Sequence, residues 1–117
     1  MGSPFTEDHQ AFRKIVRDFA EKELAPHVDE WERDELFPNW VFKRAGELGI
    51  LGAHYDEDVG GAGGDFWMNV VSSEELARCG AAGVTMGLLV QASMATPCIA
   101  DLGTPEQKKE FLEPALR

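Results

Sequence analysis

The stretch that decides the fold is CGAAGVTMGLLVQASMATPCIA, residues 79–100, in which no side chain carries a charge. The chain around it is strongly acidic: its 117 residues hold 11 Lys and Arg against 21 Asp and Glu, a net charge of −10 at pH 7. Glycines, polar residues and Pro97 make the stretch only modestly apolar, so we expect no membrane span. A helix without charge on any face is typical of one buried on all sides. We therefore predict a buried helix over 84–101, with Pro97 as a kink or in its last turn.

The residues before this stretch have the spacing of amphipathic helices. Thr6 is a good N-cap residue. A stripe of apolar residues follows at steps of three and four: Phe12, Ile15, Val16, Phe19 and Ala20. Pro26 ends this first helix or opens the next segment, because its ring clashes with the preceding turn. A short helical continuation through Val28 and Trp31 follows.

Proline, aspartate and glycine bound two further helices. Pro38 is expected to open one of them, and Gly49 is a suitable residue to follow its last turn. Asp65 is an N-cap candidate for the next helix, which we expect to end at Gly80 or Gly83. Within it, Glu74 and Glu75 are adjacent and point in different directions on a helix, so ion pairing between helices is favoured over acid–base catalysis.

The last segment gives the clearest local pattern. Thr104-Pro105-Glu106-Gln107 has the residue order of a capping box with proline at the first helical position, and Pro114 later breaks that helix. Strand patterns are nearly absent. The sequence therefore predicts an all-α fold, an up-and-down bundle-like domain of five or six helices. We place this single domain at residues 4–117, after an expression scar at residues 1–3.

The glycine-rich segment at residues 60–64 invites comparison with nucleotide-binding loops. A dinucleotide fingerprint would require a third glycine where Phe66 stands, and no Lys-Ser/Thr pair follows. Asp56, Glu57 and Asp58 lack the alternate spacing of a calcium loop and would repel phosphates. We therefore expect a structural turn with no metal-binding or cofactor-binding residues.

Several other function classes are excluded by composition. A net charge of −10 argues against a nucleic-acid partner, whose phosphates the protein would repel. Cys79 and Cys98 have no metal or disulfide spacing, and we expect both to be buried thiols. The three histidines lie in unrelated segments, so neither a metal site nor a general base is indicated. No catalytic residue is predicted.

The uncharged stretch is the one remaining candidate for binding. Met86, Leu89, Val90, Ser93 and Met94 could line an apolar slot, because small neighbouring residues let another backbone or a ligand lie close. From periodicity alone, ordinary core packing is the favoured explanation of the same residues.

Taken in order, five short motifs resemble the N-terminal helical domain of the acyl-CoA dehydrogenase family. They are FAEKELAP at 19–26, ELGILG at 47–52, GGAG at 60–63, EELAR at 74–78 and LGTPEQKK at 102–109. Each is weak alone, and their order and intervals carry the resemblance. The sequence departs from the family at Asp56 and Val59, where the family usually has Pro and Tyr.

The resemblance implies a flavoprotein with helical, β and helical domains, in which other domains bind FAD. A carboxylate base beyond Arg117 would take the α-proton of an acyl-CoA thioester while the flavin takes the β-hydride. The family also implies an electron-transfer flavoprotein as partner, a homo-oligomer, and a cytoplasmic (bacterial) or mitochondrial-matrix location. On this resemblance, Met86, Leu89, Val90 and Ser93 become candidate substrate-binding residues, and this chain alone should be inactive.

Two alternatives stay open at this point. Nitroalkane oxidases and flavin-dependent monooxygenases of the same superfamily share this helical domain, and the residue that discriminates them lies outside this sequence. A non-catalytic helical module that binds a lipid or a partner protein would also fit a chain without a catalytic constellation.

Overall fold

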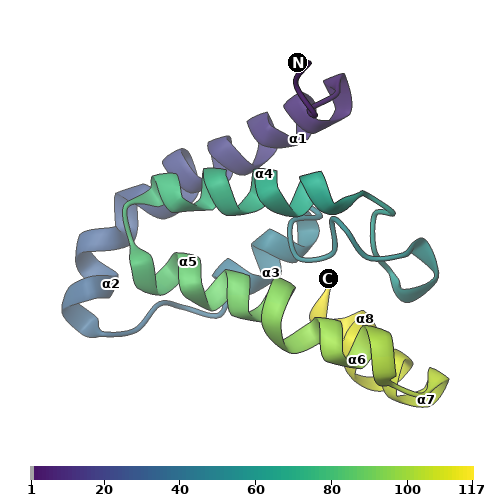
Figure 1. The fold of residues 1–117 in the computed structure, drawn as a ribbon. Helices are drawn as coiled ribbons and strands as arrows, with labels where there is room; N and C mark the ends of the chain where they lie inside the picture. The colour runs from purple at the N-terminus through teal and green to yellow at the C-terminus, as the bar shows by residue number, and fades with distance from the viewer. Residues whose placement is uncertain (1) are drawn as a thin grey trace.

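The computed structural model describes residues 2–117, and none of these residues lies in a β-strand. The predicted all-α class and the number of helices are confirmed, since the helical segments join into five rods (Figure 1). The α-helical segments within these rods are α1 Glu7–Asp18, α2 Val28–Asp34, α3 Trp40–Glu47, α4 Phe66–Leu76, α5 Ala82–Leu89, α6 Thr96–Leu102, α7 Pro105–Gln107 and α8 Glu113–Ala115. The predicted expression scar includes Met1, which lies outside the described residues.

The first rod runs from α1 to α2 without a break. Thr6 caps α1 as predicted: its hydroxyl accepts from the backbone N–H of His9, whose ring in turn accepts from the N–H of Thr6. A π-helical segment, Phe19–Leu24, and a 3₁₀ turn, Ala25–His27, join α1 to α2. Pro26 is accommodated within that turn, so the rod continues to Asp34.

The middle rods begin and end close to the predicted residues. α3 begins at Trp40, two residues after Pro38, and Gly49 follows its last turn at φ +74°, a backbone region that favours glycine. Asp65 caps α4 by accepting from the N–H of Met68. α4 passes through a 3₁₀ turn, Ala77–Cys79, to Gly80 at φ +83°. The local caps thus set most helix boundaries.

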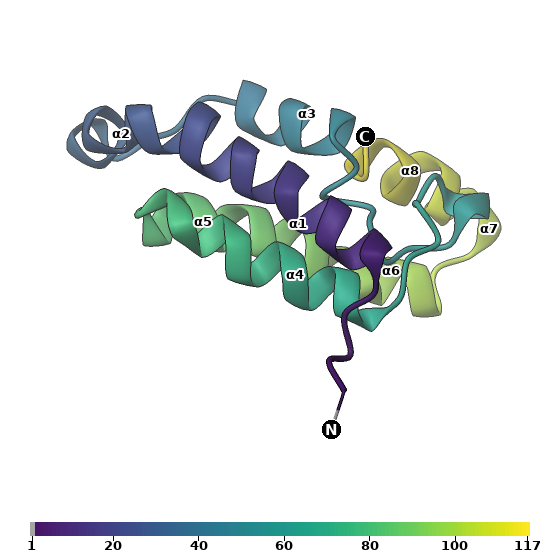
Figure 2. The ribbon, with the colours of Figure 1, turned by 90° about the horizontal axis from the view of Figure 1, so that it is seen from above.

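α1 and α4 lie side by side, and α5 packs beneath them (Figures 1 and 2). The main core is built from the apolar faces of the first four rods. Its large, fully buried members are Val16, Phe19, Leu24, Val41, Leu51, Leu76 and Leu88. A second, smaller cluster of Tyr55, Leu112 and Leu116 joins the loop after α3 to the C-terminal helices. The final rod consists of α7, a π-helical segment Lys108–Leu112, and α8.

The uncharged stretch forms the fourth rod, which consists of α5, a π-helical segment Val90–Ala95, and α6. The prediction that it is buried on every side is wrong. One line of residues at steps of four faces the core: Val84, Leu88, Ala92 and Thr96. A second line is exposed along the whole rod: Met86, Val90, Met94, Cys98 and Leu102. The chain itself therefore covers one face of this uncharged rod and leaves the other face exposed.

Two smaller expectations concern the same rod. Cys79 is buried as predicted, whereas Cys98 is exposed, because it falls on the uncovered line. The run Ala82–Leu102 is the one helix of residues 2–117 that is long and apolar enough to cross a membrane by length and composition. Core helices of soluble proteins meet the same two conditions, so this property alone is weak evidence for a span.

Candidate functional site: an uncharged helix face

Part of the exposed line of the fourth rod, with two partly buried neighbours, forms a candidate site that we call the neutral face: Met86, Leu89, Val90, Ser93 and Met94. Met86 is 58% exposed and Met94 is 66% exposed, which is unusual for side chains of this size and polarity. Leu89 is partly buried and packs against the main core, so it fixes the rod beneath the face. The face therefore presents flexible thioether and branched aliphatic side chains on a well-anchored backbone.

A pocket of about 460 Å³ lies at one end of the neutral face, where the chain turns from α4 into α5. Its lining residues are all uncharged: Ala77, Gly80, Ala81, Ala82, Thr85, Met86 and Leu89. The small residues at the turn leave the space, and Met86 and Leu89 form its apolar side. Two of the four predicted substrate-binding residues thus share one pocket.

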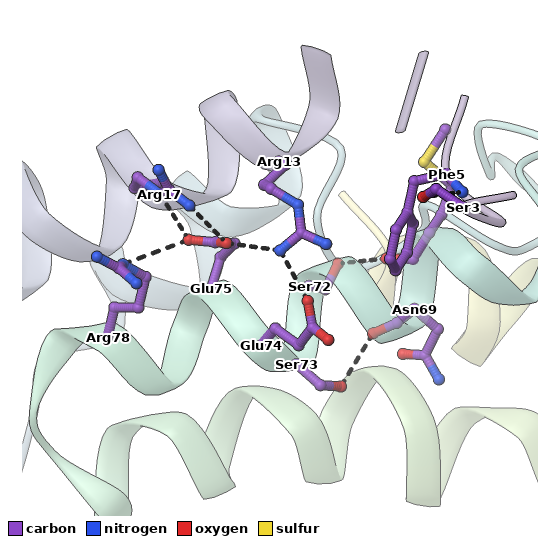
Figure 3. A network of polar contacts seen from close by, with 11 residues as sticks. Ser3, Phe5, Arg13, Arg17, Asn69, Ser72, Ser73, Glu74, Glu75 and Arg78 are labelled. Carbon is purple, nitrogen blue, oxygen red and sulfur yellow. Dashed lines mark hydrogen bonds and ion pairs between the residues drawn. The ribbon is translucent and has the colours of Figure 1, made fainter. Parts of the chain in front are cut away.

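The other two predicted residues lie farther along the rod. Val90 is 37% exposed on the neutral face, outside the pocket lining. Ser93 turns toward α4, where its hydroxyl donates to the Asn69 side-chain oxygen at 2.8 Å. Asn69 in turn accepts the Ser73 hydroxyl at its backbone oxygen, at 2.9 Å (Figure 3). Ser93 therefore marks the polar edge of the face, with its hydroxyl already bonded within the chain.

An uncharged face of this kind binds apolar groups, such as the methylenes of an alkyl chain or an aromatic ring. Each buried CH₂ contributes about 0.8 kcal/mol to binding. A carboxylate or ammonium placed there would lose hydration without gaining a partner. The chemistry of the face is thus apolar packing, and its one hydroxyl, that of Ser93, is already bonded to Asn69.

The glutamate pair of α4 behaves as the sequence analysis favoured, as ion-pairing groups. Glu75 is buried between α1 and α4, and it accepts from Arg13 at 2.7 Å and from Arg17 at 2.8 Å (Figure 3). Arg78 lies 3.4 Å away. Hydrogen bonds from Arg17 and Arg13 outweigh burial and lower the pKa of Glu75 from 4.5 to about 2. A carboxylate held ionised in this way is a structural tie and a poor proton carrier at neutral pH.

The neighbouring Glu74 shares one arginine with this network. Its carboxylate accepts from the same Arg13 nitrogen at 2.7 Å, but its side chain is 51% exposed. The hydrogen bonds to both glutamates raise the pKa of Arg13, that to Glu75 most. The two adjacent carboxylates thus differ in burial while sharing a partner.

The glycine loop is the structural turn that the sequence indicated. Each backbone N–H from Gly60 to Gly64 donates to a backbone carbonyl of this chain at 2.8–3.1 Å. A Cβ on Gly61 would collide with the backbone of Tyr55, and one on Gly64 with that of Ala53. The loop has no free N–H to offer a flavin pyrophosphate, and acidic residues precede it. Within residues 2–117, no group of three His, Cys, Asp or Glu could hold a metal ion.

One buried polar cluster was missed by the sequence analysis. The Tyr55 hydroxyl lies 2.6 Å from the Thr96 hydroxyl and donates to the backbone oxygen of Ala92 at 2.9 Å. Burial is the main cause that raises the pKa of Tyr55, so this phenol stays protonated at neutral pH. The partners stand 41 positions apart in sequence. No local pattern joins them, although a tyrosine after an apolar connector was a visible hint.

A family model described as "Acyl-CoA dehydrogenase, N-terminal domain" matches residues 6–117. This chain belongs to the acyl-CoA dehydrogenase family.

Individual relatives agree with the family match. The acyl-CoA dehydrogenase domain is 36% identical over 115 residues to a protein of Bacillus subtilis named a probable acyl-CoA dehydrogenase, covering 97% of this chain and 30% of that protein. It is 37% identical over 114 residues to a 3-(aryl)acrylate reductase of Clostridium sporogenes, covering 97% of this chain and 30% of that one.

A solved structure supports the same fold. The butyryl-CoA dehydrogenase of Megasphaera elsdenii superposes with a TM-score of 0.87 at 35% identity, over 99% of this chain and 31% of that one. The acyl-CoA dehydrogenase domain described here therefore spans about 30% of the length of these relatives.

Proposed function

We propose that the full-length protein is an FAD-dependent acyl-CoA dehydrogenase and that this chain forms one wall of its acyl-binding cavity. Met86, Leu89, Val90 and Ser93 line that wall. The observation that carries the proposal is the neutral face: in a chain with a net charge of −10, one rod leaves large apolar side chains uncovered beside an uncharged pocket. An acyl tail offers only CH₂ groups, so it gains from such a surface and from no charged one.

Each predicted residue has a distinct part in this proposal. Met86 and Leu89 contact the acyl chain at the pocket, and Val90 continues that contact along the rod. Ser93 limits the apolar surface on the α4 side, because its hydroxyl is held by Asn69. None of these residues moves a proton. Their contribution is to bind and orient the tail and to exclude water from it.

The reaction requires groups that this proposal assigns to other parts of the full-length protein. FAD supplies a hydride acceptor when bound. The glycine loop, with its N–H groups committed to carbonyls, does not fit as its phosphate site. The carboxylate base is likewise assigned beyond Arg117. We further propose an electron-transfer flavoprotein as the electron acceptor, a homo-oligomer, and a location in the bacterial cytoplasm or the mitochondrial matrix.

The test is to express the natural full-length gene and record its visible spectrum. A bound flavin should absorb between about 350 and 500 nm, and a saturated acyl-CoA should bleach that absorption anaerobically. Bleaching by a nitroalkane in place of an acyl-CoA, or rapid return of the absorption when oxygen is admitted, would favour the sister oxidases or monooxygenases. Tight fatty-acid binding without any flavin would favour a non-catalytic lipid-binding module.

A second candidate function is the reverse reaction, reduction of an α,β carbon–carbon double bond. It is favoured by the 37% identity to a protein named as a 3-(aryl)acrylate reductase. The neutral face accepts an aryl group as readily as an alkyl chain, because methionine packs well on aromatic rings. Chemically reduced enzyme that is reoxidised by an arylacrylate, and oxidised enzyme that no saturated acyl-CoA bleaches, would support the reductase.

A further inference from the structure

The π-helical segment Val90–Ala95 lies in the middle of the neutral face and ends just before a proline. In a π register each carbonyl pairs with the N–H five residues later. The partner of the Ala92 carbonyl would then be residue 97, and Pro97 has no N–H. Since Ala92 is buried, its oxygen cannot turn to water. An unpaired buried carbonyl is costly, so something else must donate to it.

Tyr55 supplies that donor from outside the rod. Its hydroxyl donates to the Ala92 oxygen at 2.9 Å, in the place of the missing proline N–H. The Thr96 hydroxyl donates to the Gln91 oxygen at 2.6 Å and lies 2.6 Å from the Tyr55 hydroxyl. Tyr55 is 6% exposed and Thr96 is 3% exposed. Two hydroxyl protons are thus shared among three short contacts inside the protein, with the Ala92 and Gln91 carbonyls of the widened turn and between the hydroxyls themselves.

The ring of Tyr55 is held in place by apolar packing, which fixes the position of its hydroxyl. It packs with Leu112 and Leu116 in the second apolar cluster, which joins the loop after α3 to the C-terminal helices. On the same stretch of the rod, the Gln91 side chain donates to the Ala115 carbonyl at 3.2 Å. The widened turn is therefore held from the side opposite the neutral face.

A widened turn also decides which side chains face outward. Inserting a π turn rotates all residues that follow it relative to those before it. Val90, Ser93 and Met94 belong to the π segment, whereas Met86 and Leu89 precede it in α5. The relative direction of the two groups thus depends on whether the π turn persists.

We propose that the Tyr55 and Thr96 hydroxyls are positioning residues that hold the π turn and thereby set the shape of the acyl-binding wall. This inference rests on the proposed function for its ligand and on the geometry above for its mechanism. Without the two hydroxyls, the segment relaxes toward an ordinary α register, and Val90, Ser93 and Met94 rotate relative to Met86. The wall then prefers acyl chains of a different length or shape.

The experiment uses the full-length protein with Tyr55→Phe, Thr96→Val and Thr96→Ser. The first readout is the ratio of kcat/KM for a short and a long straight-chain acyl-CoA, which does not depend on the fraction of folded enzyme. The second is amide hydrogen exchange across residues 90–97. Ser72→Ala is the matched control, because its buried hydroxyl bonds only to the Met68 carbonyl within α4.

We expect the substrate ratio to change by about fivefold or more in Tyr55→Phe and Thr96→Val. Exchange across 90–97 should quicken by about tenfold in both. Thr96→Ser, which keeps the hydroxyl, and Ser72→Ala should stay within about twofold of wild type in both readouts.

Two outcomes overturn the inference in different ways. Exchange at wild-type rates in Tyr55→Phe and Thr96→Val would show that the hydroxyls do not hold the turn. Faster exchange with an unchanged substrate ratio would show that the turn does not shape the acyl site. A wild-type protein that no acyl-CoA bleaches refutes the proposed function itself, and the exchange experiment then still decides whether the hydroxyls hold the turn.

Discussion

The contact between α1 and α4 and the rod from α5 to α6 differ in charge and in how much of their surface the chain itself covers. The first contact is rich in charge: three arginines converge on Glu75, and His9 from α1 lies 2.8 Å from the Asp65 carboxylate that caps α4. Its partners are all present within the chain. The rod has no charge from residue 79 to residue 100, and one line of its large apolar side chains is left exposed.

The groups of the α1–α4 contact find their partners within the chain, whereas the exposed apolar side chains of the α5–α6 rod are not covered by it. Ion pairs of α1 and α4 satisfy one another, so nothing further is needed to stabilise that contact. Met86, Val90 and Met94 are exposed, and covering them with another apolar group would lower the free energy. Charge therefore marks the contact between α1 and α4, whereas the uncovered face of the rod has none.

The largest expected effect sharpens the contrast between the two sides of the rod. Leu88, fully buried, and Met86, 58% exposed, lie two residues apart on α5. Leu88→Ala should lower the free energy of unfolding by about 3 kcal/mol, because it leaves a cavity in the main core. Met86→Ala should lower it by less than about 1 kcal/mol. Urea unfolding of the chain measures both, and equal losses would contradict the assignment of buried and open sides.

The next effect separates the two adjacent glutamates. Glu75→Gln should lower the free energy of unfolding by about 2 kcal/mol, because it removes the charge on which Arg13 and Arg17 converge. Glu74→Gln, the matched control on an exposed side chain, should change it by less than about 0.5 kcal/mol. If both variants unfold at the same urea concentration, the ion network does not hold the contact.

The pH dependence of the same contact follows from the lowered pKa of Glu75. The folded state binds the proton less readily than the unfolded state, since the pKa falls from 4.5 to about 2 on folding. The stabilisation is therefore fully present above about pH 4.5 and is lost as the pH falls toward 2. The difference in unfolding free energy between wild type and Glu75→Gln should shrink over that interval. A difference that stays constant down to pH 2 would rule out this source.

The smallest expected effect on stability belongs to the neutral face. Val90→Glu should change the free energy of unfolding by less than about 0.5 kcal/mol, because Val90 is 37% exposed and the longer glutamate side chain can extend into water. In the full-length protein it should nevertheless weaken acyl-CoA binding by about tenfold or more, since the charge must be desolvated. Leu36→Glu, on a side chain that is 74% exposed after α2, is the control and should leave the affinity unchanged. Equal affinities for all three proteins would remove Val90 from the site.

Much of the fold was predictable because its boundaries are local. Thr6, Asp65 and Thr104 cap helices with their own side chains, and Gly49 takes a positive φ that few other residues tolerate. Each of these devices involves neighbours within three or four positions. Sequence spacing alone therefore identified them.

The candidate site was predictable only in part, because burial depends on distant elements. An uncharged run has the same pattern whether its own chain or a ligand covers it, so burial on all sides was a reasonable but wrong expectation. The Tyr55 and Thr96 pair depends on a contact across 41 positions. Pro97 was expected to kink the rod or to lie in its last turn, but the rod continues through α6 to Leu102. The widened turn before Pro97 and the donor that completes it required the structure.

The most direct test of the central claim is to photolabel the neutral face. The full-length protein would be irradiated with an acyl-CoA that carries a diazirine near the end of its tail, and the adducts would be mapped by mass spectrometry. We predict adducts within residues 85–94 that a natural acyl-CoA competes away. Competed adducts found only outside this chain, or labelling of 85–94 that no acyl-CoA suppresses, would contradict the assignment of this face to the acyl tail.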